Sequence, residues 1–173
     1  MIVIKETKHC DSRALNPDEK LTEEAVKHDT ELHIEAVKKC GDFICDKIKE
    51  QFNEHDHTKL DNLEEFTDAL SSGAKGAEFK KHPWWQKHLT ERHHLNDRVP
   101  DDVNLIDVLE LICDCCSAGM ARSGEVYDLK LSDEVLKKAF DNTGKMLLKE
   151  IKVEKDDDYE GKFKKTLGLK EEE

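Results

Sequence analysis

One segment of the chain, 102-DVNLIDVLELICDCCSAGM-120, is apolar on nearly every side of a helix. A helix of this kind has to be buried, so we expect it to run through the centre of the domain. Asp107, Glu110 and Asp114 interrupt it at positions i, i+3 and i+7, which lie on one face. Three buried carboxylates without compensating charge would be very unfavourable. This face therefore either borders solvent or lies opposite a cation.

The overall composition also favours helices. The 173 residues are enough for one domain with its own core, and they are 39% charged and 36% hydrophobic with only three prolines. We expect an all-α fold with a single helical domain over residues 22–151. An N-terminal segment, 1–21, precedes this domain, and a charged C-terminal tail, 152–173, follows it.

The net charge of −12 limits the partners of the protein. Extended nucleic acid and anionic membranes both need a basic surface, so neither is expected to bind. A small anionic substrate in a local positive pocket is compatible with this charge. No run approaches the ~18 apolar residues of a membrane span, and the first ten residues are too polar for a signal peptide. We expect a cytoplasmic protein, and the sequence leaves its oligomeric state open.

The cysteines contain no CxxC pair with zinc-finger spacing. The six are Cys10, Cys40, Cys45, Cys113, Cys115 and Cys116. Three of them lie in the apolar segment described above. We therefore expect reduced thiols that serve as small core residues, rather than disulfides or a cysteine-based zinc site.

Helical periodicity covers most of the remaining chain. Thr22 is a suitable N-cap for a first helix that extends to residue 52. The stripe that this helix is expected to bury consists of His33, Val37, Cys40, Ile44 and Ile48. Further helices are expected over 60–70, 84–94 and 132–153. In the last of them, the inward residues are Val135, Ala139, Phe140, Met146 and Leu147.

All nine histidines lie in the first 94 residues of the chain. This concentration indicates that the first half of the protein uses them. The ligand-type residues, in chain order, are His33, His55, Asp56, His88, His93, His94 and Asp114. Imidazole nitrogens and carboxylate oxygens are ligands that iron, manganese and zinc accept.

The order of these residues resembles the HD superfamily of metal-dependent phosphohydrolases. The signature of that superfamily is a histidine, a later His-Asp pair and a distal aspartate, each from a different helix. The segment 55-HDHTK-59 is similar to the HDxxK form of the subgroup that cleaves cyclic dinucleotides, and His88 and 93-HH-94 match the extra histidines of that subgroup. The resemblance covers roughly residues 30–116. The loop signature of the subgroup is absent from 93-HHLNDRVP-100.

A second resemblance concerns the source of the protein. The segments 103-VNLIDVLELI-112 and 119-GMARSGEVY-127 are similar to uncharacterised small proteins of tailed bacteriophages. This resemblance carries no established activity, but it implies a phage-encoded protein that works in the host cytoplasm.

The HD resemblance implies a helical bundle with one or two divalent ions (Fe, Mn or Zn) at its centre. The first ion would be held by His33, His55, Asp56 and Asp114. Asp56 would bridge to a second ion, held by His88, His93 and His94. Metal-bound water has a pKa near neutrality and the ions polarise a phosphoryl oxygen, which is suitable chemistry for phosphoester hydrolysis.

The same resemblance assigns the catalytic and substrate-binding residues. Asp56 and Lys59 would be catalytic, with Lys59 neutralising charge on the substrate phosphate. Arg92 and Arg122 are further candidates for phosphate contacts, because a guanidinium group fits two phosphate oxygens. The substrate would be a small phosphorylated molecule, of which a nucleotide is the leading candidate.

Simpler interpretations stand beside these roles. His33 could be a core histidine with an ordinary hydrogen bond, the HH pair and Lys59 could be solvent-exposed, and Arg122 could cap its helix. The polar segment 8-KHCDSR-13 could close over the pocket. The leading function is a metal-dependent phosphohydrolase. The alternatives are a non-catalytic, metal-stabilised phage accessory or host-interaction protein and, less favoured, an HD-type di-iron oxygenase.

Overall fold

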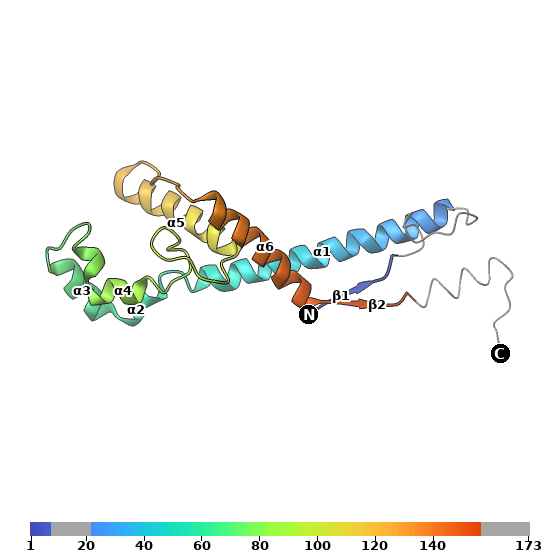
Figure 1. Ribbon diagram of the computed structural model, residues 1–173, viewed down its shortest axis with the longest axis horizontal. Coiled ribbons are helices and arrows are strands. Elements are labelled where there is room, and N and C mark those ends of the chain that lie inside the picture. The colour runs from blue at the N-terminus through green and yellow to red at the C-terminus, as the bar shows by residue number, and fades with distance from the viewer. Residues whose placement is uncertain (8–21, 157–173) are drawn as a thin grey trace. The chain divides into compact units, whose positions relative to one another are not determined.

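The computed structural model describes residues 1–7 and 22–156 (Figure 1). It is mostly helical, which confirms the all-α class expected from the composition. The chain divides into two compact units, Met1–Cys45 with Leu147–Glu173 and Asp46–Met146. These boundaries differ from the single domain over 22–151 that the sequence predicts. Segment 8–13 and the tail from residue 157 onward lie outside the described residues.

The first unit contains a small parallel sheet. β1 (Ile2–Lys5) pairs with β2 (Ile151–Glu154), so that Ile2 is opposite Ile151 and Lys5 is opposite Glu154. β2 begins directly after α6 (Asp133–Glu150). The sequence predicts a helix to 153, which is wrong here because α6 ends at Glu150, and the first residues of the predicted C-terminal tail belong to β2. The alternating β-branched residues of 151-IKVE-154 suit a strand.

α1 (Glu23–Asn53) begins as the sequence predicts. The hydroxyl of Thr22 accepts the N–H of Ala25 at 3.1 Å, which confirms the predicted N-cap. Only Ala25 and Asp29 are buried along the whole helix.

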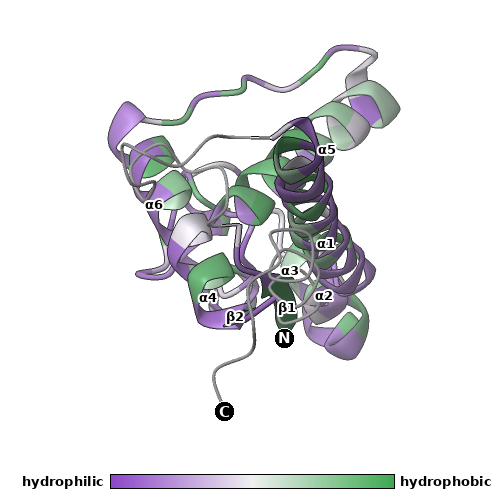
Figure 2. Ribbon diagram, turned by 90° about the vertical axis from the view of Figure 1, so that its right-hand side faces the viewer, coloured by the Kyte–Doolittle hydropathy of each residue, from purple (hydrophilic) through white to green (hydrophobic). Residues whose placement is uncertain are grey.

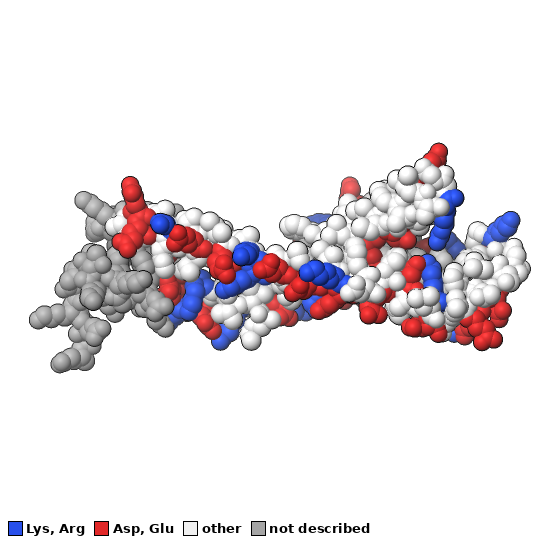
Figure 3. All heavy atoms as spheres, turned by 180° about the vertical axis from the view of Figure 1, so that it is seen from behind, with Lys and Arg blue, Asp and Glu red and all other residues white. Residues whose placement is uncertain are grey.

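The apolar stripe expected on α1 is not buried. Val37 is 57% exposed, and the isoleucines and cysteine that follow it in the stripe are only partly buried. Oppositely charged side chains alternate along the helix, and pairs such as Lys27 with Glu31 lie four residues apart (Figure 3). Such pairs support a helix that faces water, so α1 can persist without a core against its stripe.

The second unit consists of short helices followed by two long ones. Its elements are the last residues of α1, α2 (His57–Asp61), α3 (Leu63–Ser71), the 3-10 turn η1 (Phe79–Lys81), α4 (Pro83–His88), α5 (Leu105–Ser123) and α6 as far as Met146.

Two of these helices are shorter than the sequence predicts. The helix expected over 60–70 is interrupted at Asn62, whose backbone (φ −126°, ψ 44°) is not helical, and it divides into α2 and α3. The helix expected over 84–94 ends at His88, and successive turns follow. Arg92 therefore does not share a helical face with His88.

The core of the second unit lies between α5, α6 and the loop before α5. Its buried residues are Leu95, Val103, Val108, Leu111, Cys115 and Ala139. α5 starts with a capping box, in which the Asn104 side chain accepts the N–H of Ile106 (2.8 Å) and the Asp107 carboxylate accepts the N–H of Asn104 (2.9 Å).

The prediction that α5 is buried all round is wrong. Leu109 is 43% and Ile112 39% exposed, so only one side of the helix faces the core. In α6, Phe140 is 68% exposed although the sequence pattern predicts that it faces inward. No helix in the part of the chain that the structure describes is long and apolar enough to cross a membrane.

The cysteines within the described ranges are free thiols, but only one of them is a core residue. Cys115 is buried, Cys40 and Cys116 are half-buried, and Cys45 and Cys113 are exposed. The expectation of small core thiols is therefore met only at Cys115.

Candidate metal centre

The His55–Asp56 pair lies in the turn that follows α1. Asp56 has a φ of 58°, the only positive φ at a residue other than glycine in the described ranges. This conformation costs on the order of 1 kcal/mol and persists only where neighbours hold it. The Glu91 carboxylate holds it here, because it accepts the N–H groups of Asp56 (2.7 Å) and Thr58 (2.9 Å).

Three further histidines come from α4 and the turns after it. His88 is the last residue of α4, and its ring stacks on Trp84 with the centroids 4.9 Å apart. His93 and His94 follow in the turns, where the ring of His94 meets Trp85 in a T-shaped contact at 5.3 Å. His88 and His93 are each only 1% exposed. A solvent-exposed HH pair is therefore not what the structure contains.

The carboxylate of Asp56 lies between two groups of potential ligands. Its Oδ2 is 3.6 Å from Nε2 of His55, which is itself 3.7 Å from Oδ1 of Asp114. Its Oδ1 is 3.5 Å from Nε2 of His88 and 3.8 Å from Nε2 of His93. Two atoms bound to one metal at ~2.1 Å are about 3.0–3.4 Å apart. Both groups are thus only slightly wider than a coordination sphere.

Hydrogen bonds on the outer side of the rings determine which nitrogen faces the centre. Thr58 has one hydroxyl proton, which it donates to Glu91 (2.5 Å), so its oxygen accepts the Nδ1–H of His88 (2.7 Å). His55 donates its Nδ1–H to Oε1 of Glu110 (2.8 Å). In a neutral imidazole the other nitrogen, Nε2, then carries a lone pair. His88 therefore presents an acceptor atom to the centre of the cluster, and His55 does so when its ring is neutral.

Acceptor atoms without a hydrogen-bond partner meet around Oδ1 of Asp56, whereas Oδ2 of the same carboxylate pairs with Lys59. The buried atoms of the cluster that lack a hydrogen-bond partner are Asp56 Oδ1, His88 Nε2, His93 Nδ1 and His94 Nε2. Buried polar atoms are rarely unpaired, and lone pairs that face carboxylate oxygens repel them. A cation would satisfy both, so the residues of the cluster fit a metal ion. Groups of three residues with ligand atoms within 4.8 Å of one another are His88–His93–His94, His55–His93–Glu110 and Asp56–His88–Glu91.

Glu110 supports histidines of both ligand groups. Besides accepting from His55, its Oε1 lies 3.4 Å from Nδ1 of His93. Its Oε2 accepts from the amide of Gln51 (2.7 Å), which also donates to Asp107 (2.8 Å). Carboxylates in this position orient metal-binding histidines and increase their basicity.

The charges of the cluster shift the pKa values of its members. The carboxylates of Asp114 and Glu110 raise the pKa of His55 to about 10. Burial raises the pKa of Glu110, but hydrogen bonds from imidazole and amide groups outweigh it and lower the value to about 2. Burial and repulsion from neighbouring histidines lower the pKa of His94 to about 4. The carboxylates therefore favour a protonated His55 ring at pH 7, whereas the His94 ring is neutral.

The carboxylates of α5 have three different surroundings. Asp107 is fully buried and accepts two N–H groups of Arg92 (2.6 and 2.8 Å). Glu110 faces the histidines, and Asp114 borders the cluster. Arg92 is predicted from the sequence to contact a substrate phosphate, but Asp107 and Asp102 hold its guanidinium instead. Asp107 also raises the pKa of Arg92.

Lys59 reaches the cluster from the first turn of α2. Its Nζ makes an ion pair with Oδ2 of Asp56, three residues earlier, and its side chain is only 22% exposed. Lys59 is therefore not an ordinary surface lysine, although its partner in the structure is a carboxylate of the protein.

Two predicted site residues lie away from the cluster. His33 is exposed, belongs to the first unit and lies twenty residues before the last residue of α1, which is more than five helical turns. His33 lies on α1 and His55 in the turn directly after it, so the two do not come from different helices as the HD resemblance implies. Arg122 is exposed in the last turn of α5, eight residues or about 12 Å beyond Asp114.

Sequence patterns do not identify all the residues that build the site. Glu91 carries one signal, since it lies between His88 and the 93-HH-94 pair at a spacing of i, i+3 from the former. Thr58 and Gln51 carry none, because hydroxyl and amide side chains are common on any helix.

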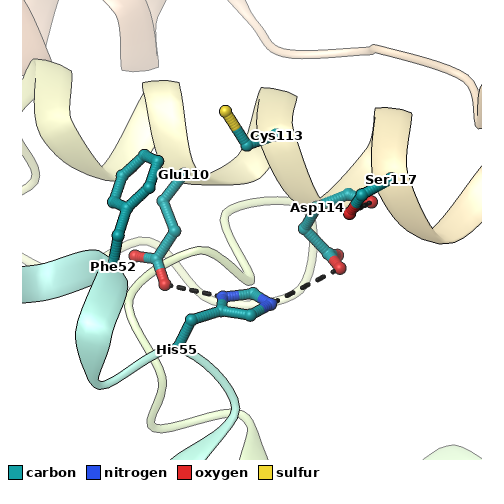
Figure 4. A pocket seen from close by; sticks show the side chains of 6 residues that line it. All are labelled: Phe52, His55, Glu110, Cys113, Asp114 and Ser117. Atoms are coloured by element: carbon teal, nitrogen blue, oxygen red, sulfur yellow. Dashed lines mark hydrogen bonds and ion pairs between the residues drawn. The ribbon is translucent and has the colours of Figure 1, made fainter.

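A pocket of about 140 Å³ opens beside the first ligand group (Figure 4). Its lining residues are Phe52, His55, Glu110, Cys113, Asp114 and Ser117. In Figure 4 the ring of His55 lies between the carboxylates of Glu110 and Asp114. A small ligand in this pocket would meet the Nε2 side of His55.

Comparison with known proteins adds no assignment. The chain matches no protein-family model, and neither a curated protein nor a solved structure is significantly similar to it.

Proposed function

We propose that this protein is a metal-dependent phosphohydrolase that acts on a nucleotide or a related phosphoester. The observation that carries the proposal is the group of buried, unpaired polar atoms around Oδ1 of Asp56, which lies 3.5 Å from Nε2 of His88. The order His-Asp, His, His-His and Asp along the chain resembles the HD superfamily, which supports a hydrolase. The segments similar to tailed-phage proteins support a phage origin.

Two divalent ions fit the ligand groups. The first would be held by His55 Nε2, Asp56 Oδ2 and Asp114 Oδ1, and the second by Asp56 Oδ1, His88 Nε2 and His93 Nε2 with His94 beside them. Nitrogen and oxygen ligands without thiolate suit iron, manganese or zinc. Three protein ligands leave positions open, as in catalytic metal sites. Bound ions lower the pKa of water and polarise a phosphoryl oxygen.

The pocket favours a substrate that is recognised by its phosphate end. Its volume of about 140 Å³ is below the ~300–1,000 Å³ of pockets that enclose whole small molecules. A phosphate group fits beside His55 and Asp114, and the remainder of a nucleotide would stay outside. The protein would then select the phosphoester more strictly than the base.

Lys59 is the basic residue best placed to assist. Its ammonium group pairs with Oδ2 of Asp56, the oxygen assigned to the first ion. An ion at that oxygen would neutralise the charge of Asp56 in place of Lys59. The three N–H donors of Lys59 would then be available for phosphate oxygens. Positive charge beside the phosphate stabilises the charge that develops during transfer.

A metal-stabilised accessory protein is the second candidate. The small pocket favours it, as do the ion pairs of Lys59 with Asp56 and of Arg92 with Asp107, because they leave few groups for a substrate. This candidate shares the metal site with the hydrolase but not the turnover.

Elemental analysis of protein purified without added metal tests the site itself. We expect up to two ions per chain and loss of both in Asp56→Ala, because that carboxylate is shared by the two groups. Joint replacement of His93 and His94 by alanine should lower the metal content by about half. His33→Ala is the matched control and should retain all of it, since His33 is exposed in the other unit. Unchanged metal in Asp56→Ala would contradict the site.

Turnover is tested with mono-, di- and cyclic nucleotides in the presence of Mn, Fe or Zn. We expect metal-dependent release of phosphate or opening of a phosphodiester. Lys59→Ala should lower kcat by about tenfold or more without changing the metal content. If fully metallated protein turns over none of these substrates, the accessory role replaces the hydrolase.

A further inference from the structure

α5 and α6 form an antiparallel hairpin with one buried side. They pack against each other through Val108 and Leu111 of α5 and Ala139 of α6. The N–H of Leu105, at the start of α5, donates to the hydroxyl of Thr143 in the second half of α6 (2.9 Å), which shows that the helices are antiparallel. All of these residues belong to the second unit.

α5 has a second apolar stripe beside the buried one. Leu109, Ile112, Cys116 and Met120 follow one another at spacings of three and four residues, the spacing of a helix that packs against other helices. Leu109 is 43%, Ile112 39% and Met120 56% exposed. Hydrophobic residues recur along α5 and α6 in Figure 2, whereas α1 is mostly hydrophilic.

α6 carries a matching stripe. Leu136 is 39% and Phe140 68% exposed. Each directly follows a residue packed in or against the core, Val135 and Ala139, just as Leu109 follows Val108. A step of one residue is a rotation of ~100° about the helix axis. In two antiparallel helices, this rotation points both stripes to the same side of the hairpin.

We propose that this hairpin face (Leu109, Ile112, Cys116, Met120, Leu136 and Phe140) is the interface of a homodimer. At the exposures given above, its side chains present on the order of 500 Å² of apolar surface, against the ~800 Å² that each partner contributes to a standard interface. Because homodimer interfaces are about 65% apolar, the remainder corresponds to an ordinary polar rim.

A second copy of the chain is the occupant that this geometry favours. Two helices with one shared apolar side join their own copy across a twofold axis as a four-helix bundle. The face contains no charged residue, so two chains with a net charge of −12 can meet there without opposing carboxylates. The carboxylates of α5 lie on another side of that helix, as the contacts of Asp107 and Glu110 with Arg92 and His55 show.

The dimer would also border the candidate pocket. Cys113 and Ser117, which line the pocket, lie directly after Ile112 and Cys116 of the hairpin face. The partner chain would therefore stand beside the pocket mouth. The interface itself depends on neither metal binding nor turnover.

Sedimentation equilibrium of the full chain tests the dimer, with Phe140→Asp as the decisive variant. We expect the wild type to have twice the mass of one chain at ~20 μM, and Phe140→Asp to raise the dimer Kd at least tenfold. Met120→Glu, on the other helix of the face, should act in the same direction. Leu70→Asp is the matched control, because Leu70 is 60% exposed on α3, and it should stay dimeric.

Circular dichroism separates loss of the interface from loss of the fold, because an exposed replacement leaves the helical signal unchanged. Monomeric wild type at ~100 μM would overturn the proposal. So would a Phe140→Asp variant that is folded and as dimeric as Leu70→Asp. If Phe140→Asp loses its helical signal, Met120→Glu becomes the decisive variant. An unchanged dimer Kd in Met120→Glu would then overturn the proposal.

Discussion

The two longest helices that the structure describes, α1 and α5, differ in how far their charged side chains are exposed or buried. Two of the 31 residues of α1 are buried, whereas seven of the 19 residues of α5 are, and these seven include Asp107 and Glu110. Apart from the buried Asp29, most charged side chains of α1 face water and one another at spacings of three and four residues, as Lys27 and Glu31 do. The three carboxylates of α5 each pair with a basic side chain from a distant part of the chain. A charged stripe on a helix therefore indicates a site only where other segments supply its partners.

The largest effect that follows from this contrast concerns Asp107. Asp107→Ala removes the acceptor of Arg92 and Gln51 and breaks the capping box of α5. We expect the free energy of unfolding to fall by roughly 3 kcal/mol, the lower end for a broken buried pair, because Arg92 is one-third exposed. Urea unfolding followed by circular dichroism measures it. Asp107→Asn keeps an acceptor oxygen and should lose about half as much. A loss below about 1 kcal/mol in the alanine variant would show that Asp107 contributes no more to stability than the surface ion pairs of α1.

Glu110 tests whether the buried charge of α5 serves the metal cluster. Glu110→Ala removes the acceptor of His55 and of the neighbouring His93 ring. Loss of such an outer carboxylate weakens metal binding by about 10–100-fold. Competition with a chelator of known affinity gives the value. Glu35→Ala on α1, where Glu35 pairs only with Lys39 among the contacts that the structure shows, is the control and should leave metal affinity unchanged. Equal metal affinities in the two variants would show that Glu110 does not support metal binding.

The pH dependence of stability in the metal-free protein tests the contrast between the histidines of the cluster and those of α1. His55 has a folded-state pKa of about 10 against an ordinary value of 6.5, because of the Asp114 and Glu110 carboxylates. Its contribution is therefore fully present below pH 6.5 and is lost as the pH rises toward 10. After allowance for solvent screening at this half-buried site, we expect a loss of about 1–2 kcal/mol between pH 6.5 and 8.5.

Urea unfolding of chelator-treated protein at the two pH values measures this loss. His55→Ala should abolish the difference, and His33→Ala, the exposed histidine of α1, should preserve it. Metal-loaded protein should show the opposite trend, because metal ligands must be deprotonated. Stability of the metal-free wild type that stays flat from pH 6.5 to 8.5 would contradict the raised pKa of His55.

The smallest effect is expected on α1. Glu31→Ala removes one pair with Lys27, both of them well exposed, and should change the free energy of unfolding by only about 0.3–0.5 kcal/mol. High salt should reduce the effect further. A loss as large as that of Asp107→Ala would show that α1 is covered in solution and would erase the contrast between the helices.

The sequence predicts the candidate site better than it predicts the packing around it. The structure brings His55, Asp56, His88 and the 93-HH-94 pair together and places Asp114 beside His55, while their role as metal ligands stays a prediction. These residues could be chosen because their chemistry is unusual at any position. Helical periodicity likewise predicts that most of the chain is helical, which the structure confirms.

Packing partners are what the sequence could not supply. The spacing of His33 and Val37 predicts a buried stripe, but burial also needs a covering element, and the described residues supply none over this part of α1. Arg92 resembles a phosphate-binding residue until its contact with Asp107, fifteen residues away, is known. The periodicity of α6 predicts that Phe140 faces inward, but its neighbour Ala139 occupies the core position instead. Each of these predictions depended on a contact distant in sequence.

The parallel pairing of β1 with β2 can form only late during protein synthesis. β1 leaves the ribosome before its partner, Ile151–Glu154, which follows only after the whole of Asp46–Met146 has been made. Closing so long a loop is entropically costly while it is unfolded and easier once the intervening unit is compact. Until then the Ile and Val side chains of β1 belong to an open strand edge, which is prone to pairing with other chains. A nascent chain stalled before Ile151 thus carries every residue of the metal cluster together with an unprotected strand.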